Sequence, residues 1–299
     1  MAAFPILNPA PPPPPPAIAG RIVRVFPRQT KATPTDELAY FGPPDLFAEA
    51  DEVHVSVTFT RDKPRAEALA EEWRHVAPVR VGGVAYGDEG RGYFIPGRYI
   101  KPGYTFTSRG CPRRCWFCDA WKRRPQATPI WPFEPGWNVL DDNLLACPEW
   151  HVRAVCQMLA KQGRRIHFTG GLEAAALEDY HVDLLASLKP RPVCFFAYDP
   201  GDPFETLKSA ADRMLAAGWT RESHRLRTYV LIGYPKDTFD AAEQRLRSML
   251  QIGFTPHAML WEPTTPSAEK WRPAPEWRRF QRKWARPAII HARADKGRL

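Results

Sequence analysis

Three cysteines within eight residues carry the strongest chemical signal in this sequence. Cys111, Cys115 and Cys118 form a C-x3-C-x2-C run. Thiolates this close together on one loop can hold a metal centre. A closed zinc site needs a fourth ligand, and the next Cys and His residues along the chain are Cys147 and His151. Three thiolates suit a [4Fe–4S] cluster that keeps one iron open, and a zinc knuckle or a reactive-thiol cluster is the alternative.

The cysteine run resembles that of the radical S-adenosylmethionine (radical SAM) enzymes, in particular small proteins of the phage and bacterial type. Their signature is C-x3-C-x-aromatic-C after the first strand of a partial (β/α)6 barrel, and Phe117 fills the aromatic position. The resemblance covers residues 104–261. It implies that Cys111, Cys115 and Cys118 hold three irons of a [4Fe–4S] cluster and that the fourth iron chelates S-adenosylmethionine (SAM).

The same resemblance implies an activity. An electron, supplied by a reducing partner such as a flavodoxin or ferredoxin, cleaves SAM reductively to methionine and a 5′-deoxyadenosyl radical. The radical then abstracts hydrogen from a substrate. The resemblance assigns no catalytic residue that would act on that substrate.

A glycine pair followed by an acid resembles the GGE motif of the family, which meets the SAM ammonium. Gly170 and Gly171 follow an expected strand, Arg165–Thr169, but Leu172 separates them from Glu173. Glycines allow close backbone approach, and a fixed carboxylate suits a cation. The alternative is an ordinary strand-to-helix turn in which the Glu173 carboxylate interacts favourably with the dipole of the following helix.

Two later strand ends resemble further SAM contacts of the family. Asp199 follows the expected strand Val193–Tyr198, where an acid meets the ribose hydroxyls; a plain turn acid is the alternative. Ile232 and Gly233 end the expected strand Leu226–Ile232 and would lie near the adenine. An ordinary buried strand that ends in a turn is the alternative for this pair.

Strand and helix signals alternate along the middle of the chain, where we expect the strands Tyr104–Ser108, Arg165–Thr169, Val193–Tyr198, Leu226–Ile232 and His257–Trp261. Between them we expect helices at Pro148–Gln162, Ala174–Leu188, 203–217 and Thr238–Gln251, the third capped by Asp202. Alternation with near-continuous apolar strands predicts an α/β fold with a parallel sheet. About five strands are too few for an eight-stranded barrel, so we expect a partial (β/α)6-type barrel.

The chain before the barrel has two parts. Within 20–100, strand His54–Thr60, helix Pro64–His75 and strand Val79–Val81 predict a small βαβ unit with parallel strands. This part resembles a reduced form of the cobalamin-binding half that precedes some radical SAM barrels, without its D-x-H-x-x-G loop. The run Pro11–Pro16 predicts a solvated, disordered leader. The expected domains are 1–19, 20–100, 101–265 and 266–299.

Most of the net charge of +9 lies near the end of the sequence, because residues 270–299 contain ten Lys and Arg and only two acids. Trp277, Phe280 and Trp284 share one face of an expected helix, Pro275–Ala285. Lys and Arg attract phosphates and aromatic rings stack on bases, so a nucleotide or nucleic acid is one expected partner. The alternative is a helix that docks its aromatic face on the barrel and leaves its basic face solvated.

Three hypotheses for the function follow. The first is radical SAM chemistry on a nucleotide or nucleic acid, and the second is the same chemistry on a peptide or small metabolite. The third is a non-catalytic iron–sulfur or zinc-binding interaction protein. A metal knuckle has no need of the segment Gly170–Glu173, which favours an enzyme.

The composition excludes several other classes of protein. With 44% hydrophobic and 25% charged residues, the 299-residue chain is typical of globular proteins. It has no run of 18 apolar residues and no signal-peptide pattern, so we expect a cytoplasmic protein without a membrane partner. Cys147, Cys156 and Cys194 are widely spaced and are expected to be buried small hydrophobes rather than ligands of a second cluster.

Overall fold

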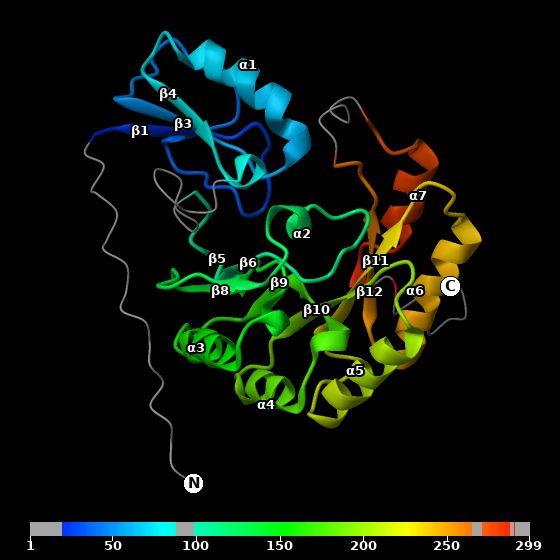
Figure 1. The fold of residues 1–299 in the computed structure, drawn as a ribbon. Helices are drawn as coiled ribbons and strands as arrows, with labels where there is room; N and C mark the ends of the chain where they lie inside the picture. Colours follow the sequence, from blue (N-terminus) through cyan, green and yellow to red (C-terminus); the bar gives the residue numbers. More distant parts are fainter. Residues whose placement is uncertain (1–19, 88–98, 265–270, 288–289, 291–299) are drawn as a thin grey trace. The chain divides into compact units, whose positions relative to one another are not determined.

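The computed structural model describes residues 20–87, 99–264, 271–287 and 290, which form two compact units (Figure 1). The expected leader, 1–19, and the end of the expected tail lie outside these residues. The first unit is drawn from Met1–Phe106, Ile130–Glu134 and Pro263–Trp271, and the second from Thr107–Pro129, Pro135–Glu262 and Arg272–Leu299. Both contain helices and parallel strands, so the α/β class is confirmed.

The first unit contains a four-stranded parallel sheet in the order β2-β1-β3-β4. Its strands are β1 (Ile22–Val25), β2 (Ala39–Tyr40), β3 (Glu52–Ser56) and β4 (Val79–Gly82). Helix α1 (Lys63–Trp73) buries its apolar face against the valines of this sheet. The predicted βαβ unit is therefore confirmed as β3, α1 and β4, whereas β1 and β2 were not predicted.

Five parallel strands of the second unit lie in the order of the sequence: β8 (Gly136–Val139), β9 (His167–Leu172), β10 (Val193–Tyr198), β11 (Leu226–Ile232) and β12 (Thr255–Leu260). The intervening helices are α3 (Glu149–Ala160), α4 (Asp179–Ser187), α5 (Phe204–Ala216) and α6 (Phe239–Ile252). Right-handed crossovers between neighbouring parallel strands place successive helices on one face of a sheet. Figure 1 shows these helices along one side of the strands.

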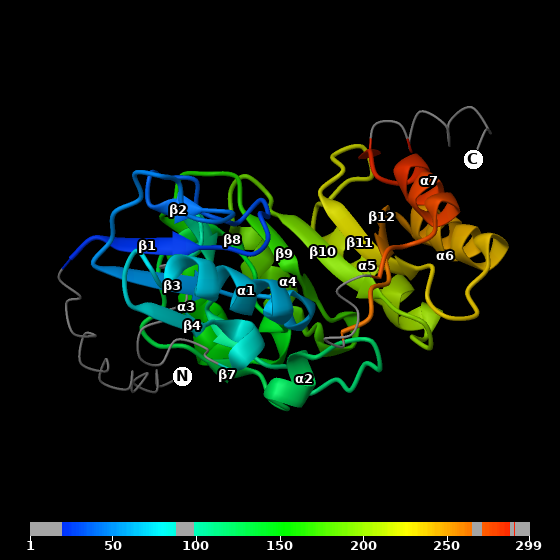
Figure 2. The same ribbon diagram turned by 90° about the horizontal axis from the view of Figure 1, so that it is seen from above.

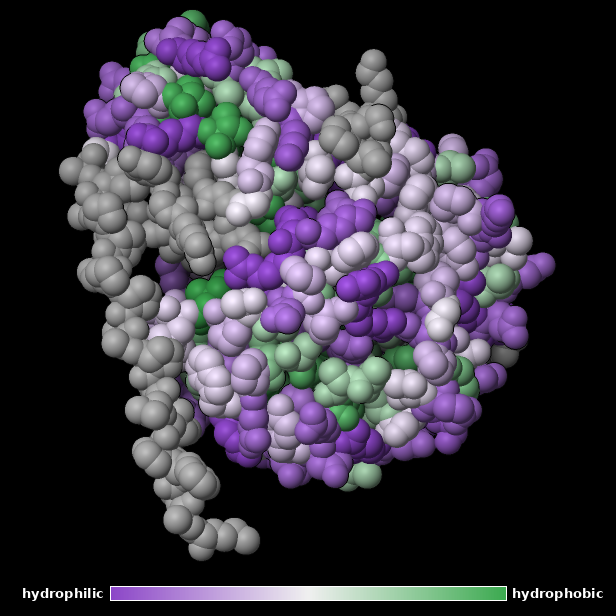
Figure 3. Space-filling model, in the orientation of Figure 1, coloured by the Kyte–Doolittle hydropathy of each residue, from purple (hydrophilic) through white to green (hydrophobic). Residues whose placement is uncertain are grey.

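The helices of the second unit are amphipathic, as their position requires. Their inner faces carry fully buried side chains such as Leu159, Met214 and Leu246. Hydrophilic side chains cover much of the outer surface over these helices (Figure 3). Thr238 caps α6 by accepting a hydrogen bond from Ala241 N, at 3.2 Å. In the described parts of the chain, no helix combines the length and apolar character that a membrane crossing requires.

Helix α7 (Pro275–Lys283) belongs to the second unit. Phe280 and Trp284 are buried, and the Trp277 ring lies 4.3 Å from the ring of Phe239 on α6. Packing of the aromatic face of this helix, one of the two expected arrangements, is thereby confirmed. Figure 2 shows α7 beside α6 and β12.

Several expected boundaries were wrong. The expected strand Tyr104–Ser108 divides into β5 (Gly103–Thr105) and β6 (Ser108–Arg109), and β6 pairs antiparallel with β7 (Thr128–Pro129). Strand β9 continues to Leu172, past the expected end at Thr169. The N-cap of α5 is Pro203 rather than Asp202, because the Asp202 carboxylate is engaged elsewhere.

Candidate functional site

The cysteines of the C-x3-C-x2-C run lie on the loop between β6 and α2 (Ala120–Arg123). All three are partly exposed. The other cysteines are buried, as predicted, namely Cys147, Cys156 and Cys194. The six cysteines therefore form two groups: three accessible thiols on one loop and three unreactive thiols buried in the core.

Local hydrogen bonds fix the conformation of this loop. Cys111 N donates to Arg124 O at 3.1 Å, and the Trp121 indole donates to Cys115 O at 2.9 Å. Gly110 has a φ of +92°, and a Cβ there would come within 2.2 Å of a backbone oxygen of the facing segment. The loop therefore requires glycine at this position and is held by bonds within the chain.

Two nitrogen donors point at cysteine sulfurs. Asn143 Nδ2 lies 3.4 Å from Cys111 Sγ, and Ala120 N lies 3.4 Å from Cys118 Sγ. N–H groups of this kind orient thiolate ligands and tune the metal centre that they hold. The two N–H groups would stabilise negative charge on Cys111 and Cys118 when these bind a metal centre.

Burial disfavours negative charge on all three thiols. It raises the pKa of Cys111 and Cys118, and it raises the pKa of Cys115 to about 11 although the Arg113 guanidinium opposes the shift. The thiols therefore stay protonated at neutral pH. A metal centre would bring the missing positive charge and release their protons.

An acidic turn after β8, which the sequence analysis missed, supports the start of the cysteine loop. Asp141 is 2% exposed and accepts hydrogen bonds from Thr107 N at 2.6 Å, from Ser108 Oγ at 2.8 Å and from the Thr107 hydroxyl. His151 Nε2 lies 3.1 Å from the same hydroxyl. This buried network connects β6 to the end of β8.

The next two residues of the turn reach the loop itself. Asp142 Oδ2 accepts from Gly110 N at 2.7 Å, and Asn143 contacts Cys111. The sequence signal was weak because Asn138 interrupts the apolar run of β8. Two acids and an amide directly after Val139-Leu140 were nevertheless a strand-end pattern that could have indicated this turn.

The glycine pair lies within β9 rather than after it, where the pairing with β10 shifts register. A Cβ on Gly170 would lie 2.2 Å from Asp141 O, so close approach to the chain after β8 requires glycine there. Gly171 has a φ of +105° and faces open space. Glu173 Oε2 accepts from Asn143 Nδ2 at 2.6 Å, which brings this predicted acid to the cysteine loop.

Arg113, inside the cysteine run, joins the ends of β9 and β10. Its guanidinium pairs with Asp202 and lies 3.5 Å from Glu173 Oε1. These three residues line a cavity of about 170 Å³ together with Ala197 and other small or apolar residues. The cavity has room for a small polar group.

Asp199 lies beside this pair of charges. Burial and the neighbouring Asp202 raise the pKa of Asp199 to about 7, and Arg113 opposes the shift. The backbone N of Asp199 donates to Asp202 Oδ2 at 2.9 Å. A carboxylic acid that titrates near neutrality can exchange a proton or a hydrogen bond with a ligand.

Ile232 and Gly233, the two residues expected near adenine, are buried or covered by other parts of the second unit. Ile232 is fully buried in β11. Gly233 donates from its backbone N to Asp237 Oδ2 at 2.8 Å, and Arg245 holds that carboxylate at 2.9 Å. A Cβ on Gly233 would lie 3.1 Å from the Trp277 ring, so this glycine is covered by α7.

Aromatic rings connect the cysteine loop with the ends of β11 and β12. The Trp116 ring lies 5.4 Å from that of Phe117, 5.9 Å from that of Tyr234 and 6.2 Å from that of Trp261. Trp116 is 50% exposed. Its partly solvated indole forms a flat surface beside the cysteines.

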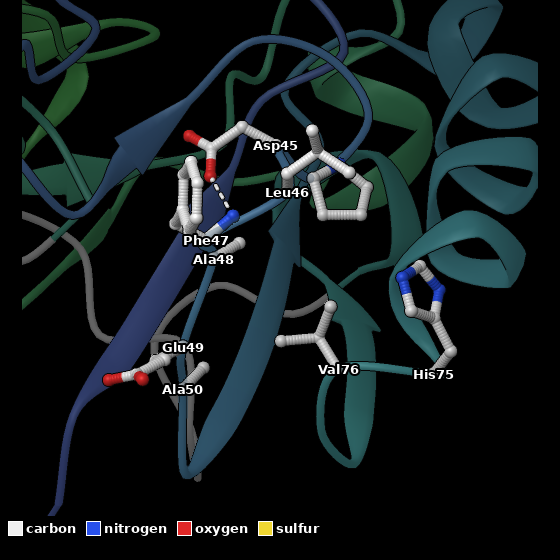
Figure 4. Close-up of a pocket in the computed structure, with 9 residues that line it drawn as sticks. Asp45, Leu46, Phe47, Ala48, Glu49, Ala50, His75 and Val76 are labelled. Carbon is white, nitrogen blue, oxygen red and sulfur yellow. Dashed lines mark hydrogen bonds between the residues drawn. The ribbon is translucent and has the colours of Figure 1, made fainter.

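A second cavity, of about 800 Å³, lies in the first unit (Figure 4). The loop at 44–50 and the residues after α1 line it, and Leu46 and Phe47 on that loop are 96% and 89% exposed. None of the residues predicted for a site lines this cavity.

Side chains able to bind one metal ion do not converge in the described parts of the chain: no group of three or more His, Cys, Asp or Glu is so placed. A single zinc ion requires ligands arranged around one point. Comparison with known proteins adds no assignment, since no protein-family model and no curated protein matches this chain.

Proposed function

We propose that this chain is a radical SAM enzyme. The observation that carries the proposal is the partly exposed C-x3-C-x2-C loop, whose sulfurs accept hydrogen bonds from Asn143 and Ala120. N–H donors of this kind orient and stabilise thiolates that bind a metal centre. The loop also lies beside acids that follow two neighbouring strands, Asp142 and Glu173.

The donor set suits a [4Fe–4S] cluster. In such a cluster each thiolate binds a different iron, so Cys111, Cys115 and Cys118 need not converge on one point. All three are partly exposed, so iron and inorganic sulfide can reach them from solvent. When bound, the cluster supplies the electron that cleaves the sulfonium C–S bond of SAM.

The residues around the loop would bind and orient SAM. Glu173 offers a carboxylate for the ammonium group, held in place by Asn143 and Arg113. Asp199 can accept a hydrogen bond from a hydroxyl in its ionised form. Open space beside Gly171 lets a ligand approach the backbone of β9.

We further propose that the second unit folds as a partial (β/α)6-type barrel. Two features support it: the strands follow one another in sequence order from β8 to β12, and α3 to α6 lie along one side. In barrels of parallel strands, ligands bind at the carboxyl ends of the strands. The turns that carry Asp142, Glu173 and Asp199 all follow such ends.

The test is anaerobic reconstitution with iron and sulfide, reduction, addition of SAM and chromatographic assay of 5′-deoxyadenosine. Cys115→Ala is expected to abolish the product, because it removes one iron ligand. Cys156→Ala is the matched control, since this thiol is buried on helix α3, and it is expected to retain activity.

Two results would contradict the proposal. One is tight binding of a single zinc ion without any cleavage of SAM, which would indicate a non-catalytic metal-binding protein. The other is equal product formation by wild type and Cys115→Ala, which would show that the loop does not carry the reaction.

A further inference from the structure

Helix α7 presents two chemically different faces. Trp277, Phe280 and Trp284 pack inward, and Gln281 Nε2 donates to Ala258 O on β12 at 3.1 Å. These contacts fix the helix on the second unit. Its orientation is therefore set by packing, and the opposite face is directed to solvent.

That opposite face is mostly basic, and its one acid within the helix, Glu276, is exposed beside Lys283. At about 100° per residue, four exposed cations lie opposite the aromatic stripe, namely Arg278, Arg279, Arg282 and Lys283. Within the ranges that the structure describes, no carboxylate forms an ion pair with any of them. Elsewhere on the same unit, exposed helical cations such as Arg153, Lys208 and Arg247 each have an acidic partner. The charge on α7 is thus left for an external anion.

An exposed aromatic surface lies next to this helix. Trp116, half exposed on the cysteine loop, contacts the rings of Tyr234 and Trp261. Tyr234 directly follows Gly233, which the Trp277 ring of α7 covers. The aromatic face of α7 and the aromatic surface around Trp116 therefore both lie at the end of β11, and the cations lie on the other face of the same helix.

We propose that α7 and the Trp116 surface together bind single-stranded nucleic acid, which deepens and rests on the proposed function by naming its substrate class. Phosphates would contact the cations of α7, and an unpaired base would stack on Trp116 beside the cysteine loop. The combination favours a nucleic acid over an acidic protein because carboxylates need no stacking surface. It favours a single strand over a duplex, whose bases are already stacked.

Fluorescence anisotropy with fluorescein-labelled 20-nucleotide single-stranded RNA and DNA, over a KCl series, tests the proposal on the full chain. The triple variant R278Q/R279Q/R282Q is expected to bind at least tenfold more weakly at low salt. Its log Kd against log salt should become less steep by about two units, since each lost phosphate contact removes about 0.7. Trp116→Ala should weaken binding about tenfold and leave the salt slope unchanged.

The matched control is R153Q/K208Q/R247Q, which removes the same number of exposed helical charges. The proposal predicts a change of less than threefold in its Kd. An equal loss in both triple variants would overturn it, because net charge alone would then explain binding. Tighter binding of duplex DNA, or equal affinity for poly-glutamate, would also overturn it.

Assays of the wild-type protein for SAM cleavage and for nucleic-acid binding test the proposed function and this inference separately. Formation of 5′-deoxyadenosine without nucleic-acid binding would contradict the inference and leave the radical SAM proposal standing. Specific nucleic-acid binding without SAM cleavage would contradict the proposed function and support α7 as a binding surface.

Discussion

Asn143 and Cys111 are joined by an N–H···S hydrogen bond of 3.4 Å, although one follows β8 and the other follows β6. The same amide nitrogen donates to Glu173 at 2.6 Å. One side chain thus orients a thiol and a carboxylate that come from two other segments of the chain. Its replacement should disturb both groups without altering the sheet.

Asn143→Ala is therefore expected to weaken retention of the metal centre by about 10- to 100-fold, the usual effect of losing such a supporting donor. The rate of iron loss to a coloured chelator measures this in reconstituted protein. Asn138→Ala is the control, because this amide lies in β8 and bonds Thr169 instead. Equal rates of iron loss in wild type and Asn143→Ala would show that the hydrogen bond has no such role.

Asp141→Asn should destabilise the second unit by about 2 kcal/mol, because the amide cannot accept all the hydrogen bonds that the buried carboxylate receives. Urea unfolding followed by circular dichroism measures the change. Asp179→Asn is the control, since its side chain is 97% exposed and pairs with Arg213 at the surface, and it should cost less than 1 kcal/mol. A similar small cost for both variants would contradict this account of the network.

Gly170→Ala and Gly171→Ala should differ sharply. The first places a methyl group 2.2 Å from Asp141 O and forces the backbone after β8 away, so we expect loss of several kcal/mol or failure to fold. The methyl group of Gly171→Ala meets open space. This variant loses only the free energy needed to hold alanine at a φ of +105°, about 1–3 kcal/mol. Thermal unfolding of the two variants decides this. The reverse order would mean that the contact with Asp141 O is not what requires glycine.

Asp199 should make stability depend on pH between about 4 and 7. Because its folded pKa is raised to about 7, the unfolded chain loses this proton first as pH rises, and stability falls until the folded state ionises too. Asp199→Asn should therefore stabilise the protein at pH 8, by up to about 4 kcal/mol, and have little effect at pH 4. Urea unfolding at both pH values measures the difference. The exposed Asp183→Asn controls for loss of a carboxylate, and equal effects of Asp199→Asn at both pH values would contradict the shift.

The repeated strands and helices of the second unit were predictable because their sequences are locally unambiguous. Strand β10 is a nearly continuous apolar run, β11 ends in the apolar run Val230–Ile232, and the bounds expected for both match the structure. Strand β8 was missed because Asn138 and the flanking prolines and glycine weaken its pattern. The Asn138 amide oxygen accepts a hydrogen bond from the Thr169 hydroxyl on the next strand, a contact that no local pattern can indicate.

Several residues of the candidate site could be predicted from the sequence, but the hydrogen bonds and ion pairs that join them could not. The cysteines, the glycine pair and Glu173 were singled out from spacing and resemblance, and hydrogen bonds link Cys111 with Glu173 through Asn143. Arg113 and the acidic turn were missed, since their importance comes from partners far away in sequence. The prediction that Asp202 caps a helix was wrong. Its position before Pro203 is typical of an N-cap, but its carboxylate instead forms an ion pair with Arg113.

The Trp277 ring that covers Gly233 also has a consequence for the order of events during synthesis. A ribosome releases the turn after β11 well before it releases α7, so the newly made turn stays uncovered until residues 277–284 have emerged. The surface around Tyr234 and Trp116 then reaches its final form only after translation has passed this helix. Any ligand that needs both parts must arrive after that moment.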